Sequence, residues 1–325
     1  MALARRGTSV LSAEGRRRLG RLLGWGWYRL VPIRRRVAHQ QVEARLALSA
    51  GEARNLVREM YLLLGERFVD LFGTDAPIET IGLEATQASL APGSGAIVVT
   101  AHLGSYERLA GVPLGSRPIH IVSSRFRAGW AQSLWEALRF GRVSVLEPTR
   151  ALRSLKRLVL DGHVVVFMLD QHSPAHTAVP TTFLGQTAWT SATPARLALS
   201  TGAPLVPVVT WRADGVDRVE FGPVLRPRDD LRRAEAIEEL TGRAVAILER
   251  AVRAHPAQWL WLHRRWKPAG STTERFQERR RVRMAGRERE HTTPGASGVV
   301  EPSEARRRDA QVEPGGHVVG GVEHV

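Results

Sequence analysis

A histidine and a glutamate five positions apart are the residues best placed for chemistry in this chain of 325 residues. His102 follows the apolar run AIVVT at 96–100, and Glu107 comes after Gly104 and Ser105, which suit a turn into a helix. A carboxylate in the first helical turn could bind one ring nitrogen, fix the tautomer and stabilise the imidazolium. The other ring nitrogen would then be free to remove a proton from an oxygen nucleophile. The competing interpretation is a structural histidine beside a glutamate that the helix dipole favours.

The elements expected around this pair are those of an α/β domain. Apolar runs predict buried strands at 96–100, 119–122, 143–146, 164–169 and 205–209, with a further strand near an edge at 216–224. Amphipathic stretches predict helices at 127–140, 149–160, 191–201 and 231–254. Buried strands that alternate with helices favour a largely parallel central sheet flanked by helices. Ligands gather at the carboxyl ends of the strands in such sheets, and His102 stands at one of these ends.

Three regions are predicted along the chain. Residues 1–72 form a helical N-terminal region at a membrane interface, and residues 73–267 form the α/β core. Residues 268–325 are rich in Arg, Glu, Gly and Pro and poor in large apolar side chains. Such a segment cannot bury enough surface to offset its ordering entropy, so we expect a disordered basic tail.

The N-terminal region contains a helix start that the sequence specifies well. Two helical segments in 35–72 meet near Ser49, which is a suitable N-cap for a helix that stops at Gly73. The segment 19–33 before them carries tryptophans beside arginines. That composition suits a helix lying in a membrane interface, and it equally suits an ordinary first helix packed on the core.

Composition limits the classes of partner and site. Lys and Arg outnumber Asp and Glu by 47 to 32, and the formal net charge of +15 attracts nucleic acid, anionic lipid or an acidic carrier protein. Cysteine is absent, which excludes disulfides, thiolate metal sites and cysteine nucleophiles and fits a reducing compartment. No run of about 18 uncharged apolar residues occurs, so we expect no helix that crosses a bilayer. His172 and His176 have metal-pair spacing, but Pro174 disfavours a helix there, so no metal is predicted.

The box His-x4-Glu after a first strand resembles that of the glycerolipid and lysophospholipid acyltransferase superfamily. Within it, the chain is similar to the bacterial lipid A biosynthesis acyltransferases, which add secondary lauroyl or myristoyl chains. The likeness covers residues 19–267. It also rests on Asp170-Gln171 after the strand VVVFML, on the loop, helix and strand at 178–209 with Val206-Pro207, and on QWLWLHRRWK at 258–267.

This resemblance implies an α/β acyltransferase that moves an acyl group from a thioester to a hydroxyl of a lipid A precursor. His102 would be the general base, Glu107 would orient it, and backbone amides around Gly104 and Ser105 would stabilise the oxyanion. The donor would be acyl carrier protein or acyl-CoA and the acceptor a glycolipid in an anionic membrane. No cofactor is implied. The implied location is the cytoplasmic face of the inner membrane.

The resemblance also suggests residues that contact the substrates. Asp170 and Gln171 would bind the acceptor or orient its hydroxyl, although a strand-terminal Asp can equally cap the following loop. His263, Arg264 and Arg265 are expected in one helical turn, either contacting lipid phosphate or the acidic carrier, or forming a solvated face over packed tryptophans. Arg139 is expected to hold phosphate, with Arg125 or Arg142 as alternatives.

Two alternatives to this function stay open. The same chemistry could act on a phosphatidylinositol mannoside or a lysophospholipid. A different class is a nonenzymatic basic protein that binds membranes or nucleic acid. Against nucleic acid, no recognised nucleic-acid fold appears, and the charge within 1–267 follows helices that flank an α/β core.

Overall fold

The computed structural model describes residues 11–31, 33–73, 76–112, 114–123, 143–146 and 152–268. The predicted helix at 127–140, the arginines proposed for phosphate (Arg125, Arg139 and Arg142) and all but the first residue of the predicted tail at 268–325 lie outside these ranges.

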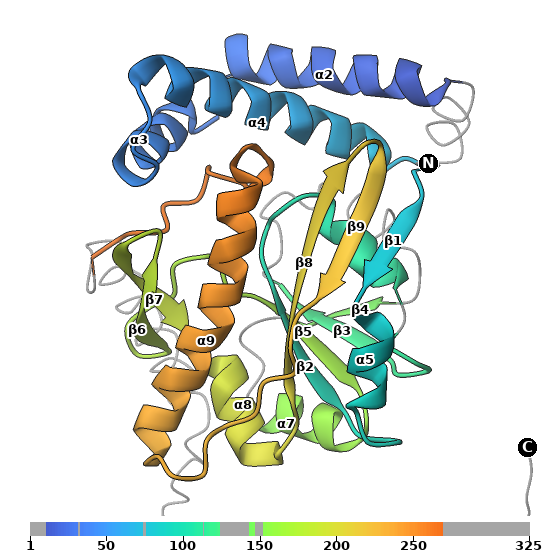
Figure 1. The fold of residues 1–325 in the computed structure, drawn as a ribbon, viewed down its shortest axis with the longest axis vertical. Helices are drawn as coiled ribbons and strands as arrows, with labels where there is room; N and C mark the ends of the chain where they lie inside the picture. The colour runs from blue at the N-terminus through green and yellow to red at the C-terminus, as the bar shows by residue number, and fades with distance from the viewer. Residues whose placement is uncertain are drawn as a thin grey trace, which may run out of the picture. The chain divides into compact units, whose positions relative to one another are not determined.

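A seven-stranded sheet forms the centre of the part of the chain that the structure describes, in the order β1-β9-β8-β2-β5-β3-β4 (Figure 1). Neighbouring strands run parallel except β8 and β9, which are antiparallel. The predicted largely parallel α/β fold is therefore confirmed. The strands are β1 (Ile78–Ile81), β2 (Ala96–Thr100), β3 (Ile119–Val122), β4 (Val143–Leu146), β5 (Val164–Met168), β8 (Leu205–Ala213) and β9 (Val216–Phe221).

The central strands are apolar on both faces because helices and loops cover both sides of the sheet. Ile97 and Val99 belong to one buried cluster, which includes side chains of α4 (Ala50–Asp70), α7 (Leu152–Leu160), α8 (Thr193–Thr201) and α9 (Arg233–Ala254). Ala96 and Val98 belong to a second buried cluster on the opposite face. Successive side chains of a strand point to opposite faces, so the continuous apolar run AIVVT is what a doubly covered strand requires.

Helix α4 begins where the sequence predicts it. The Ser49 hydroxyl accepts the Glu52 backbone N–H at 3.3 Å, and the Glu52 carboxylate accepts the Ser49 backbone N–H at 2.8 Å. This reciprocal pair satisfies two backbone donors that would otherwise lack partners at the helix start. The preceding helices are α2 (Ala13–Arg29) and α3 (Arg35–Arg45), so the division of 35–72 into two helices is also confirmed.

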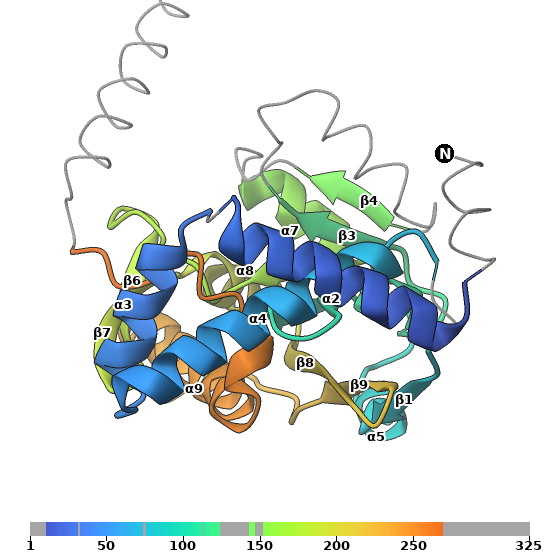
Figure 2. The same cartoon turned by 90° about the horizontal axis from the view of Figure 1, so that it is seen from above.

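Helix α2 lies along α4 and packs closely against it through glycines (Figure 2). A Cβ atom at Gly24 would lie 2.2 Å from the Tyr61 carbonyl oxygen, and one at Gly65 would lie 2.1 Å from the Gly20 carbonyl oxygen. The two backbones can therefore approach this closely only where side chains are absent. No helix within the described ranges is long and apolar enough to cross a membrane.

The structure contains elements that the sequence analysis did not predict. Strand β1 and helix α5 (Leu83–Ala88) precede β2. Strand β1 forms the edge of the sheet, and β9 lies next to it, as the predicted strand near an edge at 216–224 requires. The stretch 178–191, expected to begin as a loop, forms the antiparallel hairpin of β6 (Ala178–Phe183) and β7 (Gln186–Ser191). The hairpin lies beside α9 (Figure 1).

The α2–α4 contact predicts a position-specific effect of a methyl group. We expect Gly24→Ala to lower the free energy of unfolding by about 1–3 kcal/mol, because the added carbon overlaps the α4 backbone. The matched control is Gly26→Ala in the same helix, where a Cβ meets nothing within 4 Å. That change should raise the stability by up to about 1 kcal/mol through helix propensity. Equal free energies for the two variants in urea unfolding would contradict the close packing.

Candidate active site

His102 lies at the carboxyl end of β2, in the middle of the sheet, and a C-terminal segment holds its backbone there. The His102 carbonyl accepts the Leu260 N–H at 3.0 Å, and the Gly104 N–H donates to the Gln258 carbonyl at 3.2 Å. Leu103 and Trp259 form an antiparallel bridge between these two bonds. Residues separated by more than 150 positions therefore fix the main chain around the histidine.

Asp170, not Glu107, is the carboxylate on the His102 ring. The Nδ1 atom of His102 lies 2.9 Å from Asp170 Oδ1, and the His102 backbone N–H donates to Asp170 Oδ2 at 2.8 Å. The Trp259 indole N–H donates to the same Oδ2 at 2.8 Å. Asp170 is 2% exposed, so these donors supply the hydrogen bonds that a buried carboxylate requires. The geometry thus differs from the expectation that Glu107 binds the ring and that Asp170 binds substrate.

Gln171 bridges two imidazoles at the other edge of the His102 ring. Its Nε2 lies 3.2 Å from His102 Nε2 and 3.1 Å from His263 Nε2. Asp170 accepts a hydrogen bond from the Nδ1–H of the neutral His102 ring, so His102 Nε2 is an acceptor and the Gln171 amide donates to it. The His102 and His263 ring centroids are 5.3 Å apart. The ring nitrogen that a general base needs is therefore unprotonated and faces a polar side chain.

The pKa values of the two histidines are shifted in opposite directions from the ordinary value. Burial alone would lower the pKa of His102, but the charge of Asp170 and the hydrogen bond to it outweigh burial, with a smaller contribution from Glu107, and raise that pKa. Burial, followed by the charge of His102, lowers the pKa of His263 to about 4. His263 is thus neutral near neutral pH, and His102 is the more basic imidazole.

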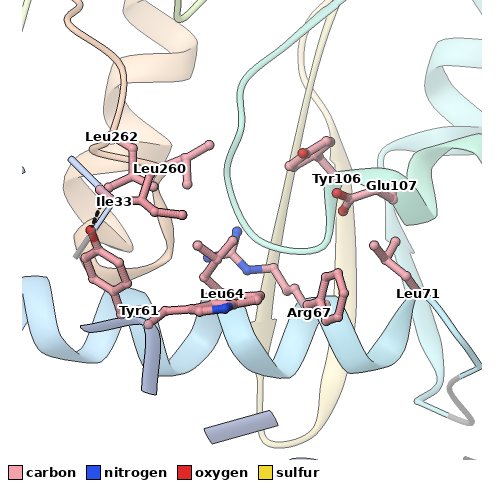
Figure 3. A pocket seen from close by; sticks show the side chains of 11 residues that line it. Ile33, Tyr61, Leu64, Arg67, Leu71, Tyr106, Glu107, Leu260 and Leu262 are labelled. Carbon is pink, nitrogen blue, oxygen red and sulfur yellow. Dashed lines mark hydrogen bonds between the residues drawn. The ribbon is translucent and has the colours of Figure 1, made fainter. Parts of the chain in front are cut away.

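Glu107 lies in the first turn of the 3-10 helix Tyr106–Gly111, as expected, but its side chain lines a cavity instead of binding the histidine ring. The cavity has a volume of about 240 Å³. Figure 3 shows α4 beneath it, with Tyr106 and Glu107 on the opposite side. Burial raises the pKa of Glu107 and lowers the pKa of Arg67. The lining residues are Trp27, Ile33, Tyr61, Leu64, Arg67, Phe68, Leu71, Tyr106, Glu107, Leu260 and Leu262.

Tyr106 connects the cavity to the histidine. Its ring packs edge-on against the His102 ring, with centroids 5.0 Å apart. Most of the other lining side chains are apolar, so the cavity is suited to a hydrocarbon chain. Its charged groups, Arg67 and Glu107, are near Tyr106 and the turn that carries His102. The arrangement therefore places an apolar volume next to a candidate base.

The Ser105 side chain anchors the turn after His102 to the sheet. The Ser105 hydroxyl donates to Asp217 at 2.9 Å, and Arg212 donates to both oxygens of Asp217 at 2.8 and 2.9 Å. Arg212 also pairs with Asp70 of α4 at 2.6 Å. The Gly104 N–H is already bonded to a carbonyl, so it cannot serve as the expected oxyanion donor without leaving that bond.

The basic C-terminal motif does not form one helical turn. After the short 3-10 helix Pro256–Gln258, the described residues 259–268 are not helical, and the three predicted contact residues have different surroundings. His263 joins Gln171 at the candidate site, and Arg264 is exposed. Arg265 is 0% exposed and donates to the carbonyls of Gln171 at 2.6 Å and Trp189 at 2.9 Å. A buried Arg265 cannot contact a lipid phosphate at the surface; it holds Gln171 instead.

Three residues that shape this site could not be found from the sequence: Arg67, Asp217 and Trp259 in its role as a donor to Asp170. Each acts through a contact over more than 30 positions. The apolar spacing of α4 gives no signal for the direction of Arg67. The tryptophans of QWLWLHRRWK were visible, but nothing local indicates that one indole binds a carboxylate.

The paired imidazoles make a spectroscopic prediction. In a pH titration followed by NMR, His102 should titrate above the ordinary histidine value of about 6.5, and His263 should stay neutral down to about pH 4. Asp170→Asn should lower the His102 pKa, because the cost of burying the imidazolium remains while the compensating charge is removed. A His102 pKa that does not respond to Asp170→Asn would contradict the pairing.

Comparisons with known proteins identify the family of this chain. A profile of the bacterial lipid A biosynthesis acyltransferases matches residues 49–268. The phosphatidylinositol mannoside acyltransferase of Mycobacterium tuberculosis (strain ATCC 25618 / H37Rv) is 26% identical over 209 residues, which are 62% of this chain and 63% of that relative. The chain therefore matches less than two thirds of that relative's length.

A comparison with solved structures finds the 1-acyl-sn-glycerophosphate acyltransferase PlsC of Thermotoga maritima. The likeness covers 72% of this chain and 96% of that chain, with 16% identity and a TM-score of 0.34. The family profile extends over more than half of the chain and includes His102, Glu107, Asp170 and His263. This chain belongs to the bacterial lipid A biosynthesis acyltransferase family.

Proposed function

We propose that the protein is an O-acyltransferase that moves a fatty acyl group from a thioester to a hydroxyl of a lipid A precursor. The observation that carries the proposal is the His102 ring, whose Nδ1 is held by Asp170 while its Nε2 faces Gln171 beside an apolar cavity. Family membership supports the reaction class. The proposed donor is acyl carrier protein, whose acidity suits the net charge of +15; acyl-CoA is the alternative.

In this mechanism the acceptor hydroxyl replaces the Gln171 amide at His102 Nε2. His102 takes the hydroxyl proton, and Asp170 stabilises the imidazolium that forms. Gln171, still held by His263 and by Arg265 at its carbonyl, donates an N–H to the acceptor oxygen. The oxygen attacks the thioester carbonyl, the C–S bond breaks, and the imidazolium returns the proton to the leaving thiolate. The acyl chain occupies the cavity.

A phosphatidylinositol mannoside is the second candidate acceptor, because the Mycobacterium tuberculosis relative carries that name. The test presents one labelled acyl thioester with a tetra-acylated lipid A precursor, a phosphatidylinositol mannoside or a lysophospholipid. Product with the first acceptor alone supports the lipid A proposal. Product only with another acceptor would support the proposed acyl transfer and reject the lipid A precursor as the acceptor.

His102 and Ser105 should respond differently to substitution. We expect His102→Ala to reduce transfer by about 10²–10⁴-fold, the usual contribution of a general base. Ser105→Ala should retain turnover, because the Ser105 hydroxyl is bonded to Asp217 and is not the nucleophile. The measurement is the rate of labelled product formation by variants with unchanged unfolding midpoints. A loss in Ser105→Ala as severe as that in His102→Ala would contradict direct attack by the acceptor.

We also propose that α2 docks on the cytoplasmic face of the inner membrane. Its exposed side carries Leu22 (64% exposed) and Trp25 (48% exposed), and Leu30 follows the helix at 72% exposed. Exposed Arg17 and Arg18 belong to the same helix. Apolar side chains flanked by arginines suit an anionic bilayer surface, with rings at head-group depth.

The membrane proposal predicts weaker vesicle binding after loss of apolar side chains. Leu22→Ser combined with Trp25→Ser should weaken co-sedimentation with phosphatidylcholine–phosphatidylglycerol vesicles by about tenfold or more, because each side chain contributes more than 1 kcal/mol on burial. The control is Leu160→Ser, which removes a leucine that is 59% exposed on α7. Equal binding by both variants would reject α2 as the docking surface.

A further inference from the structure

Arg67 has a hydrogen-bond donor that the described part of the chain does not use. Its Nη1 donates to the Gly104 carbonyl at 2.8 Å, and its Nε donates to the Leu63 carbonyl at 3.3 Å. Its Nη2 is buried and has no hydrogen-bond partner among the described residues. Arg67 rises from α4 into the cavity, where Glu107 and Tyr106 are its polar neighbours (Figure 3).

A buried guanidinium with an unsatisfied N–H is costly unless something binds it. Leaving such a donor unpaired costs about 1–3 kcal/mol, and more for a charged group. The charge of Glu107 offsets part of the burial cost of Arg67. Arg67 lines a cavity whose other side chains are mainly apolar. A ligand that binds its remaining N–H from this cavity would have a hydrogen-bond acceptor on an apolar chain. A fatty acyl carbonyl has this chemistry.

The proposed reaction also needs fixed donors, and two backbone amides of the turn after His102 are bonded elsewhere. A tetrahedral oxyanion requires fixed hydrogen-bond donors. The Leu103 N–H is bonded to the Ala101 carbonyl at 2.8 Å, and the Gly104 N–H is bonded to the Gln258 carbonyl at 3.2 Å. Arg67 is bonded to the same turn through the Gly104 carbonyl, two residues after His102. It is therefore a charged donor on the turn that carries the base.

We propose that Arg67 Nη2 donates to the thioester carbonyl oxygen and stabilises the oxyanion, an inference that rests on the proposed acyl transfer. When the acceptor oxygen bonds to the carbonyl carbon, the C=O π pair moves onto the oxygen that Arg67 contacts. When the C=O bond re-forms, the C–S bond breaks and its electron pair leaves with sulfur, which takes the proton held by His102. Arg67 exchanges no proton in either step.

The test compares wild type, Arg67→Met and Arg67→Lys in transfer of a labelled acyl group from acyl carrier protein to the acceptor that wild type uses. Arg67→Met should lower kcat by about 10²–10³-fold, as loss of one oxyanion donor does. The KM for the thioester should change by less than about threefold, because the contact strengthens mainly in the transition state. Arg67→Lys retains the charge but not the forked donors, and should recover part of kcat. Arg218→Met, which removes a β9 arginine paired with Glu79, is the matched control and should keep wild-type rates.

The acidic limb of the pH–rate profile of Arg67→Met distinguishes two roles of Arg67: stabilising the oxyanion and holding the turn that carries His102. Asp170 and Glu107 raise the pKa of His102, whereas Arg67 lowers it. Loss of the Arg67 charge alone should therefore move the limb to higher pH. If the substitution instead moved the turn away from Asp170, burial would dominate and lower the pKa of His102, and the limb would move to lower pH. His263 stays neutral over this range.

Three results would overturn the inference. The first is a kcat for Arg67→Met within about threefold of the wild-type value. The second is a low kcat for Arg67→Met whose acidic limb in the pH–rate profile lies at lower pH than that of wild type. The third applies if Arg67→Met does not fold, and is a wild-type kcat for Arg67→Lys. Wild type that transfers no acyl group to any acceptor would instead reject the acyltransferase proposal, and this inference with it.

Discussion

The buried pair of His102 and Asp170 is the constraint on which the rest of the structure depends. A carboxylate removed from water must be fully hydrogen-bonded, and Asp170 takes its bonds from the His102 ring, the His102 backbone and the Trp259 indole. Those donors come from the end of β2 and from the C-terminal segment. The segment at 258–260 must therefore cover the carboxyl ends of β2 and β5, and this placement also brings His263 and Arg265 to Gln171.

The parallel sheet explains why a histidine and an aspartate 68 positions apart meet. Thr100 of β2 is in register with Met168 of β5, and His102 and Asp170 each follow two residues later. The sequence predicts where both strands end, because the apolar runs are clear. It also predicts that these two ends lie on the same side of the parallel sheet. It does not predict that β5 is the neighbour of β2, since strand order depends on long-range packing. The sequence favours Glu107 as the partner of His102, because Glu107 is the carboxylate that is local in sequence.

Elsewhere in the chain, too, local features can be predicted from the sequence and long-range contacts cannot. The Ser49 capping box lies within four residues, and both the sequence and the structure have it. The buried arginines could not be predicted, because a basic residue in a sequence indicates a surface. Their acceptors include backbone carbonyls, which carry no residue-type signal. Arg265 binds the Gln171 carbonyl and Arg67 binds the Gly104 carbonyl. The hairpin of β6 and β7 was missed because Arg265 and Trp266 complete it from the far end of the chain.

The most direct measurement compares acyl transfer by Asp170→Asn and Glu107→Gln at the pH optimum, from one labelled thioester to one lipid acceptor. If Asp170 holds the base, Asp170→Asn should lose about 10²–10⁴-fold in kcat, the range expected when general-base catalysis fails. Glu107→Gln should lose much less, because Glu107 lines the cavity and does not bind the ring. The reverse order, with Glu107→Gln the more damaged, would contradict the account.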